Sequence, residues 1–374
     1  MDCLVYPVAG TLVRCPWLNA PTAQVLVMLA PEQGPARGGG GSPRLAVARI
    51  IDKLQADNYQ PVMAVELEFY LMDGTSVSEQ PPRPVIPRGK HTHVYSIEEV
   101  EALEYFFDDL YRFCDVQGLP AETAISEFGP GQLEITLIHR TDALRALDEA
   151  IMYRRLVKGV AAKHGLLACF MAKPFAAYAG SGMHLHLSLL DEQDNNVFAA
   201  EEPTGTPLLR HAIAGMGKTA ADAMALFAPH ANSYRRFCAN SYAPVTPTWG
   251  VNNRTVSLRV PTGPAASRHI EHRIAGADAN AYLAAAGILA GAHHGLKYHL
   301  DPGPPVTGDG YTSTVPSLPQ QWLQAIEQCA ASPFMREYFG DRFIEIYSAV
   351  KRTEHRRYMS EITAQDYDWY LQMV

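Results

Sequence analysis

The chain has 374 residues, of which 47% are hydrophobic and 19% are charged, as in a soluble globular protein with one large or two moderate domains. Its formal net charge of −8 argues against nucleic acid or an anionic membrane surface as a partner, because both attract basic proteins. No stretch approaches the roughly 18 uninterrupted apolar residues that a membrane span needs.

The N-terminus and the cysteines both favour a cytoplasmic protein. The first residues, MDCLVYPVAG, lack the basic segment and apolar run of a signal peptide. The six cysteines are scattered and form no CxxC pair. This favours reduced thiols over a disulfide or zinc framework.

The first half of the chain mixes loops, helices and strands. Residues 1–43 are short apolar runs broken by Pro and Gly, and they end in a glycine-rich stretch typical of a flexible linker. The apolar spacing then predicts a helix over 44–58, a strand over 61–73, helices over 98–117 and 142–164, and between these helices a strand, a tight turn at 129–131 and a second strand.

The second half continues without a regular βαβ rhythm. Its pattern predicts strands over 182–191, 253–261 and 268–274, and helices over 206–227, 278–296 and 343–359. No internal repeat is present. We therefore expect an α+β fold with a mostly antiparallel sheet packed with helices.

Residues two apart on a strand share a face, so Glu66 and Glu68 point the same way. An isolated Glu-x-Glu on a strand is more often a solvated face. Here the flanking residues are apolar, which favours a strand that carries two carboxylates toward a cation.

Two further pairs are ambiguous when each is taken alone. Glu127 and Glu134 bracket the turn FGPGQL, which either brings two carboxylates together or carries ordinary surface acids. His184 and His186 also share a strand face, and such a pair is more often hydrogen-bonded structurally than metal-bound.

The combination is more informative than its members. Five glutamates, Glu271 being the fifth, and one or two histidines on predicted strands suit hard divalent cations such as Mg²⁺ or Mn²⁺. Zinc would be expected to recruit cysteine or more histidine.

Arginines on other segments could serve phosphoryl transfer, in which guanidinium groups hold the transferring group beside a metal. The alternative for each is a surface ion pair. The chain has no GxxxxGK[ST] loop, so a nucleotide site would not be of the P-loop kind. The candidates are Arg235, Arg236, Arg254, Arg259, Arg268 and Arg273.

Five motifs, in order and with similar spacing, resemble the glutamine synthetase family over residues 44–374. They are VELEFYLMD, EFGPGQLEI, GSGMHLHLSL, NSYRRF…APVTPTWGVNNRTVSLRVP and RHIEHRIAGADANAYLAAAGILAG. The resemblance implies an ATP-dependent ligase that forms a γ-glutamyl phosphate and lets an amine displace phosphate. It also implies two or more Mg²⁺ or Mn²⁺ ions per site and a ring-shaped homo-oligomer, of the dodecamer type that is common in this family.

The resemblance also implies roles for particular residues. One metal would be held by Glu68, Glu127 and Glu134, and the second by Glu66, His184 and Glu271. The substrate glutamate would meet Gly180, Arg236 and Arg273, while Arg254 and Arg259 would stabilise the transferring phosphoryl group beside the nucleotide. His186 and Ser188 would lie close to the reacting phosphate and the nucleotide.

Three departures from the family pattern bear on the substrate. Tyr242 stands where glutamine synthetases carry an acid that binds ammonium, and a phenol with a pKa of about 10 is a poor proton acceptor. This resembles the branch that joins glutamate to polyamines, such as the γ-glutamylputrescine synthetases. The second departure is a pair of replacements, Ala179 for a common Asn and His269 for a common Arg.

The third departure is at the N-terminus. Residues 1–43 resemble only the second half of the β-grasp domain that precedes the catalytic domain in this family, so we expect a remnant there and the catalytic domain over 44–374. Two alternatives remain from sequence: glutamine synthetase proper, which uses ammonia, and a catalytically silent relative that binds nucleotide or glutamate.

Overall fold

The computed structural model describes residues 5–29, 40–75, 82–86, 94–238, 241–312, 315 and 317–374. Most of the predicted glycine-rich linker, and Cys3, lie outside these residues. The other five cysteines are free. No helix among the described ranges is long and apolar enough to cross a membrane.

One sheet of eight strands organises the molecule, with the order β10-β11-β12-β9-β5-β7-β6 and with β8 also paired to β5. All its pairings are antiparallel except β10 with β11. The α+β fold with a mostly antiparallel sheet is therefore confirmed. The strands are β5 (Gln60–Asp73), β6 (Ala121–Ser126), β7 (Gln132–Leu137), β8 (Leu166–Cys169), β9 (Met183–Leu190), β10 (Trp249–Val251), β11 (Leu258–Val260) and β12 (Ile270–His272).

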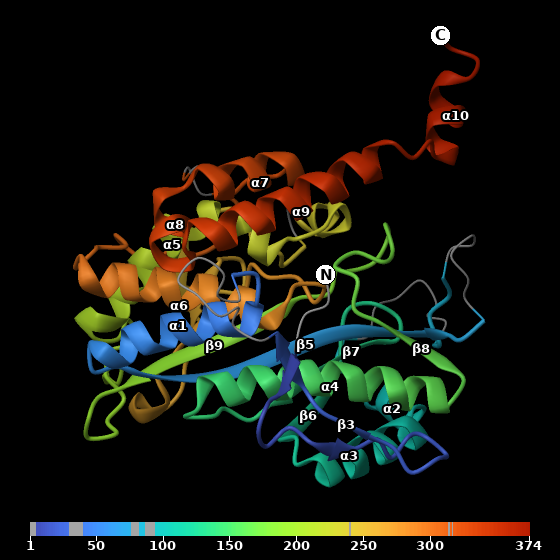
Figure 1. Cartoon of the computed structure of the whole chain (residues 1–374), viewed down its shortest axis with the longest axis horizontal. Helices are drawn as coiled ribbons and strands as arrows, with labels where there is room; N and C mark the ends of the chain where they lie inside the picture. Colours follow the sequence, from blue (N-terminus) through green and yellow to red (C-terminus); the bar gives the residue numbers. More distant parts are fainter. Residues whose placement is uncertain are drawn as a thin grey trace.

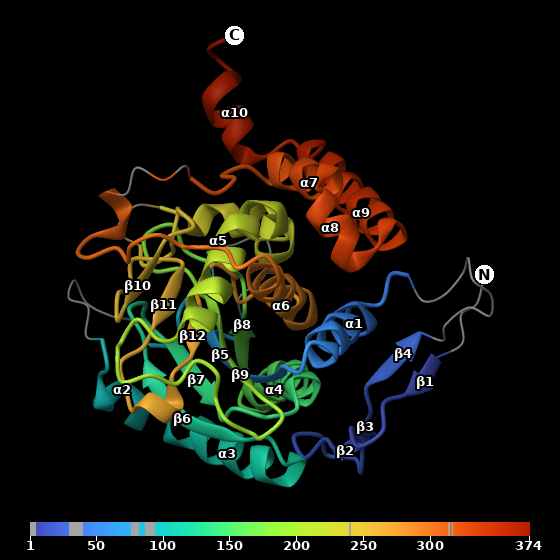
Figure 2. The same cartoon turned by 90° about the vertical axis from the view of Figure 1, so that its left-hand side faces the viewer.

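Helices cover one face of this sheet. Helices α1 and α4 pack on β5, and α6 packs on both helices (Figure 2). Helix α5 packs along α6, and α7 to α9 form a further layer outside α5 (Figure 1). The helices are α1 (Pro43–Ala56), α2 (Ile97–Glu101), α3 (Glu104–Gln117), α4 (Ala143–Lys163), α5 (Pro207–Phe227), α6 (Ala281–Lys297), α7 (Trp322–Ala331), α8 (Pro333–Phe339), α9 (Asp341–Met359) and α10 (Ala364–Tyr370).

Alternation along β5 separates core from site. Val65, Leu67 and Phe69 are buried among the helices, whereas Glu66 and Glu68 point to the opposite face. The strand belongs to the large apolar cluster that also contains the Ala-rich α6. Burying one face fixes the register of β5, because a shift of one residue would bring both carboxylates into the core.

Three predicted elements differ in extent, and one of them is the strand expected over 268–274, which is shortened to Ile270–His272. The helix expected over 98–117 is divided into α2 and α3 by a tight turn at Ala102 and Leu103, where the buried Leu103 faces the core. The strand expected over 253–261 is shortened to Leu258–Val260, since Thr255 and Asn253 form a local hydrogen-bonded turn.

The N-terminal segment forms two small sheets outside the main one. Strand β1 (Val5–Pro7) pairs with β4 (Val27–Leu29), and β2 (Val13–Arg14) pairs with β3 (Ala23–Gln24). Trp17 anchors the segment against Gly159 of α4, where an added Cβ would lie 2.5 Å from the indole ring. The domain boundary at residues 43 and 44 remains a prediction.

A cluster of charges joins α3 to α4 and gives the fold a pH dependence. The side chain of Asp109, only 10% exposed, is ion-paired with Lys163 and Arg112 and lies 3.0 Å from His164 Nε2. Burial alone would raise the pKa of Asp109, but Lys163 and Arg112 outweigh it and lower the pKa to about 2.

We expect Asp109→Asn to reduce the free energy of unfolding by about 1–2 kcal/mol at pH 7. A lowered carboxyl pKa stabilises the fold above the unfolded value and loses this effect as pH falls toward the folded value. The difference from wild type should therefore shrink between about pH 4 and pH 2 in urea unfolding. Asp108→Asn, at the exposed neighbouring position, is the control. A deficit that is independent of pH would contradict the ion-pair explanation.

Candidate active site

The predicted metal ligands meet on four strands of the main sheet. In the strand register Glu66 lies opposite His184, and Glu68 lies opposite Glu134. Glu271 of β12 lies opposite His186 of β9. Strand pairing therefore gathers side chains that are more than 200 residues apart in the chain.

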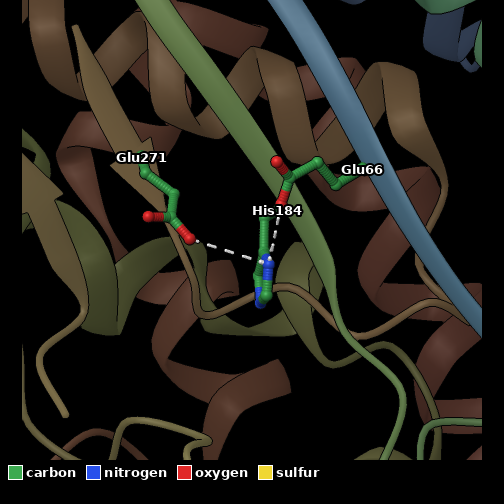
Figure 3. Close-up of side chains that lie close together, drawn as sticks. All are labelled: Glu66, His184 and Glu271. Atoms are coloured by element: carbon green, nitrogen blue, oxygen red, sulfur yellow. Dashed lines mark hydrogen bonds and ion pairs between the residues drawn. The ribbon is translucent and has the colours of Figure 1, made fainter. Parts of the chain in front are cut away.

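One group of possible ligands contains Glu66, His184 and Glu271, and one ligand atom from each lies within 4.8 Å of the others. His184 Nδ1 is 3.4 Å from Glu66 Oε2 and 3.7 Å from Glu271 Oε1. Figure 3 shows both carboxylates turned toward this imidazole. These are the three residues that the resemblance assigned to one ion.

A second group contains Glu68, Glu134 and again His184. His184 Nε2 lies 3.9 Å from Glu68 Oε1, so the imidazole is placed between the two groups. Backbone and side-chain donors orient Glu68, whose Oε2 accepts from Gly182 N at 2.8 Å and from Gln132 Nε2 at 3.2 Å.

Glu127 lies beside the second group but is not one of its members. It follows β6, and its backbone N–H donates to Gln132 O at 2.8 Å across the turn. Its side chain lines the same cavity as Glu68, Glu134 and His184. Glu127, the third ligand predicted with Glu68 and Glu134, thus lines the same cavity as this group. His184 is the third member of the group itself.

Burial and neighbouring carboxylates disfavour the ionised forms of Glu127 and Glu134. Burial and the charge of Glu68 raise the pKa of Glu127 to about 8. Burial, followed by repulsion from Glu66, Glu68 and Glu127, raises the pKa of Glu134 well above its usual range. Crowded oxygen ligands with one imidazole fit a hard divalent cation, and no described cysteine belongs to either ligand group.

Arginines compensate the innermost glutamate. Arg259 Nη1 donates to Glu271 Oε2 at 2.7 Å, and Arg273 forms an ion pair with Glu271 Oε1. Burial alone would raise the pKa of Glu271, but Arg273, His184 and Arg259 lower it to about 2. Glu271 therefore stays ionised where Glu134 resists ionisation.

Arg236 is buried and held by backbone carbonyls. Its Nη1 donates to Ile274 O at 2.8 Å, and its Nη2 donates to Arg273 O at 3.2 Å. These bonds join the 3₁₀ helix η1 (Ala231–Arg236) to the segment after β12. These two hydrogen bonds use Nη1 and Nη2 of Arg236, and Arg236 also lines the cavity that contains Glu68 and Glu134.

The predicted residues are distributed over two cavities. A cavity of about 640 Å³ is lined by seven of the predicted charged or imidazole residues together with Gly180 and Tyr242: Glu68, Glu127, Glu134, His184, Arg236, Arg254 and Arg273. A second cavity, of about 660 Å³, is lined by Glu66, His186, Ser188 and His269. Since His184 contacts both Glu66 and Glu68, the ligand groups lie between the two cavities.

The histidines differ in their surroundings. His186 Nε2 lies 3.0 Å from Glu66 Oε1, and its ring centroid is 5.1 Å from that of His269. His184 is hydrogen-bonded to Glu66 and has three carboxylates within 4 Å, an environment that suits a metal ligand better than a structural pair with His186.

Gly180 has a packing reason for its missing side chain. A Cβ there would lie 2.6 Å from Ala172 O and 2.8 Å from Arg236 Cγ. The absent side chain therefore allows Arg236 to pack closely against this backbone, and Gly180 lines the cavity of about 640 Å³. Its expected contact with the substrate glutamate stays a prediction.

Several lining residues were missed from sequence. Phe128, in the turn after Glu127, stacks on Tyr242 with ring centroids 5.4 Å apart and planes 30° apart. Lys173 and Tyr95 line the same cavity. Phe128 lies within the quoted EFGPGQLEI motif, but only the fold brings it to Tyr242. Tyr242 has a φ of 56°, a conformation that non-glycine residues adopt rarely and usually under functional constraint.

Comparisons with known proteins agree on one family. The γ-glutamylputrescine synthetase PuuA of Escherichia coli is 37% identical over 98% of this chain and 78% of its own length. The glutamate–isopropylamine ligase of a Pseudomonas species is 33% identical over 100% of this chain and 82% of its own length. The γ-glutamylethanolamide synthetase GlnA4 of Streptomyces coelicolor is 32% identical over 97% of this chain and 76% of its own length.

A solved structure described as apo GmaS without ligand superposes with a TM-score of 0.86 at 26% identity, covering 100% of this chain and 86% of that one. The model of the glutamine synthetase catalytic domain matches residues 40–370. The chain therefore belongs to the glutamine synthetase family.

Proposed function

We propose that this protein uses ATP to join L-glutamate to an amine, namely a polyamine such as putrescine. One observation carries the proposal: the carboxylate–histidine groups and the arginines face a cavity whose wall carries Tyr242 stacked on Phe128. Relatives named for putrescine, isopropylamine and ethanolamide support it. They favour an amine ligase over glutamine synthetase proper and over a silent relative.

The two ligand groups would each hold a divalent ion, for which we propose Mg²⁺ or Mn²⁺. One ligand set would be Glu66, His184 and Glu271. The other would be Glu68 and Glu134, with Glu127 as a further ligand. Such ions, when bound, neutralise nucleotide phosphates and orient them for transfer.

The chain's own residues would position both reactants. Arg236 and Arg273, beside Gly180, would hold the carboxylates of glutamate. A γ-carboxylate oxygen then attacks the terminal phosphorus of ATP, and the bond to ADP breaks. Arg254 lines this cavity and would stabilise charge on the transferring phosphoryl group, together with His186 of the second cavity and Arg259, which is paired with Glu271.

The nucleotide would occupy the second cavity, where Ser188 and His269 line the wall next to His186. In the second step the amine nitrogen attacks the γ-acyl carbon, loses a proton and displaces phosphate. The product is an amide, and the two steps together convert ATP to ADP and phosphate.

The aromatic pair would select the amine. An aromatic face attracts organic cations and also packs against a carbon chain, which ammonium lacks. Tyr242 supplies no carboxylate to receive a proton from ammonium, and its stacking partner Phe128 extends the apolar wall.

We also propose that copies of the chain assemble into a homo-oligomer. Helix α10 has no buried residue and projects beyond the body of the molecule (Figure 1). Its exposed apolar side chains, including Trp369 and Leu371, support contact with another copy. The proposed division into residues 1–43 and 44–374 has support from the separate small sheets before α1.

The proposed reaction predicts phosphate release that requires ATP, a divalent cation, glutamate and an amine together. An amine panel that includes putrescine, isopropylamine, ethanolamine and ammonium should give the highest kcat/KM with an alkyl amine. Product mass confirms the γ-amide. Turnover with ammonium alone would replace the proposal with glutamine synthetase activity.

Crowding of carboxylates predicts that stabilisation by Mg²⁺ or Mn²⁺ grows with pH. The folded pKa of Glu127, about 8, exceeds its unfolded value of about 4.3, so the metal-free fold loses stability as pH rises between these values. A bound cation removes this penalty. The metal-induced increase in Tm should therefore be larger at pH 8 than at pH 5.5 in scanning calorimetry.

Glu127→Gln should flatten this pH dependence, and Asp108→Asn, at an exposed position of α3 that lines neither cavity, should leave it unchanged. An equal increase in Tm at every pH would contradict the explanation.

Removal of the Phe128 ring should weaken amine selection. We expect Phe128→Ala to raise the KM for the preferred alkyl amine by about 3- to 30-fold, the range of a cation–π contact with a partly desolvated ring. The KM for glutamate should change little. Tyr242→Phe keeps the stacked ring and serves as the matched variant, with an amine KM within about twofold of wild type. Equal increases in both KM values for Phe128→Ala would point to general disruption instead.

A further inference from the structure

A third cavity lies away from both parts of the proposed active site. It has a volume of about 410 Å³ and is bounded by α4, the end of α5, the start of α6 and α9. Its apolar wall comes from Ile151, Leu226, Leu283, Phe343 and Ile346. The volume falls within the range of small-molecule pockets, about 300–1,000 Å³.

Two opposite charges on the wall lack ion-pair partners. Arg154 donates through Nη2 to Ala279 O at 2.9 Å, and Asp278 Oδ2 accepts from Ser233 Oγ at 2.6 Å. Neither side chain forms an ion pair with any residue that the structure describes. Arg154 Nε and Asp278 Oδ1 are both buried, and neither has a hydrogen-bond partner among the residues that the structure describes.

Such an arrangement is unfavourable while the cavity holds only solvent. A buried charge is normally paired, because desolvation opposes the ionised form. Burial indeed raises the pKa of Asp278 and lowers that of Arg154. Two more groups line the cavity, His230 and Lys351, and Lys351 is already bound to Glu354 at 2.8 Å.

We propose that this cavity binds an α-amino acid with an apolar side chain. The carboxylate would lie toward Arg154 and Lys351, the ammonium group toward Asp278, and the side chain among the aliphatic and aromatic residues. A zwitterion supplies both missing charges with no net charge of its own. A purely apolar ligand would leave Arg154 and Asp278 unpaired.

The site is connected to the residues that we propose hold glutamate, and this step rests on the proposed function. Ser233, which binds Asp278, lies in η1 together with Arg236. Arg236 in turn donates to the backbone of Arg273 and Ile274, a few residues before Asp278. A ligand in the cavity would therefore contact the loop that carries Asp278, and this loop is hydrogen-bonded to η1. Because η1 also carries Arg236, binding of the ligand should change the KM for glutamate.

The test is calorimetric titration of the full chain with L-leucine and L-phenylalanine in the presence of saturating glutamate. We expect one saturable site per chain that glutamate does not displace. 4-Methylpentanoate, which lacks the ammonium group, and the variant Asp278→Asn should each reduce affinity by about tenfold or more, the effect of losing a charged hydrogen bond.

A steric variant keeps the charges in place. Val350 lines the cavity at a half-exposed position of α9, and Val350→Trp should fill it and abolish binding. Ala349→Trp, at the adjacent exposed position that does not line the cavity, should bind like wild type. In turnover assays the amino acid should shift the KM for glutamate in wild type and not in Val350→Trp.

Absence of binding by either amino acid, or equal binding by wild type and Val350→Trp, would overturn the proposal. Binding is measured without turnover, so failure of the amine-ligase assay with retained calorimetric binding would reject only the proposed reaction.

Discussion

Repulsion among five buried or half-buried glutamates is the constraint on which the site depends. Glu66, Glu68, Glu134 and Glu271 lie on strands of one sheet, and Glu127 lies in the turn after β6. Burial, together with the charge of neighbouring glutamates, raises the pKa of Glu134 and of Glu127, whereas nearby arginines and His184 lower the pKa of Glu271. A protein carries such a cluster only where the opposite face of the strands provides stability, and here that face packs on α1 and α4.

Strand pairing gives the cluster its precision. Each ligand group contains one directly opposed pair, Glu66 with His184 or Glu68 with Glu134. Opposed Cβ atoms in an antiparallel pair are about 5 Å apart, a separation that leaves room for a cation between the side-chain tips. A rigid sheet thus holds the charged groups, and no loop closure is needed to assemble them.

The sequence was sufficient for the strands that carry the ligands, because the alternation in VELEFY and MHLHLSLL is a local signal. The ordered motifs identified the family. Local patterns do not encode which Cα positions meet across space, so the stacking of Phe128 on Tyr242 and the sharing of His184 between two groups required the fold. The packing of Gly180 against Arg236 required the fold for the same reason, because Arg236 lies 56 residues away in the chain.

The two halves of the proposed chemistry have different structural supports. The ligand groups lie mainly on paired strands, whereas Phe128 lies in a turn and Tyr242 in a loop with a left-handed backbone conformation. Loops tolerate substitution more readily than buried strands. Changes of amine acceptor can therefore accumulate at the aromatic pair without disturbing the carboxylate cluster. Under the proposed function, a common phosphoryl-transfer centre would serve relatives that are named for different amines, and the wall formed by Phe128 and Tyr242 would select the acceptor.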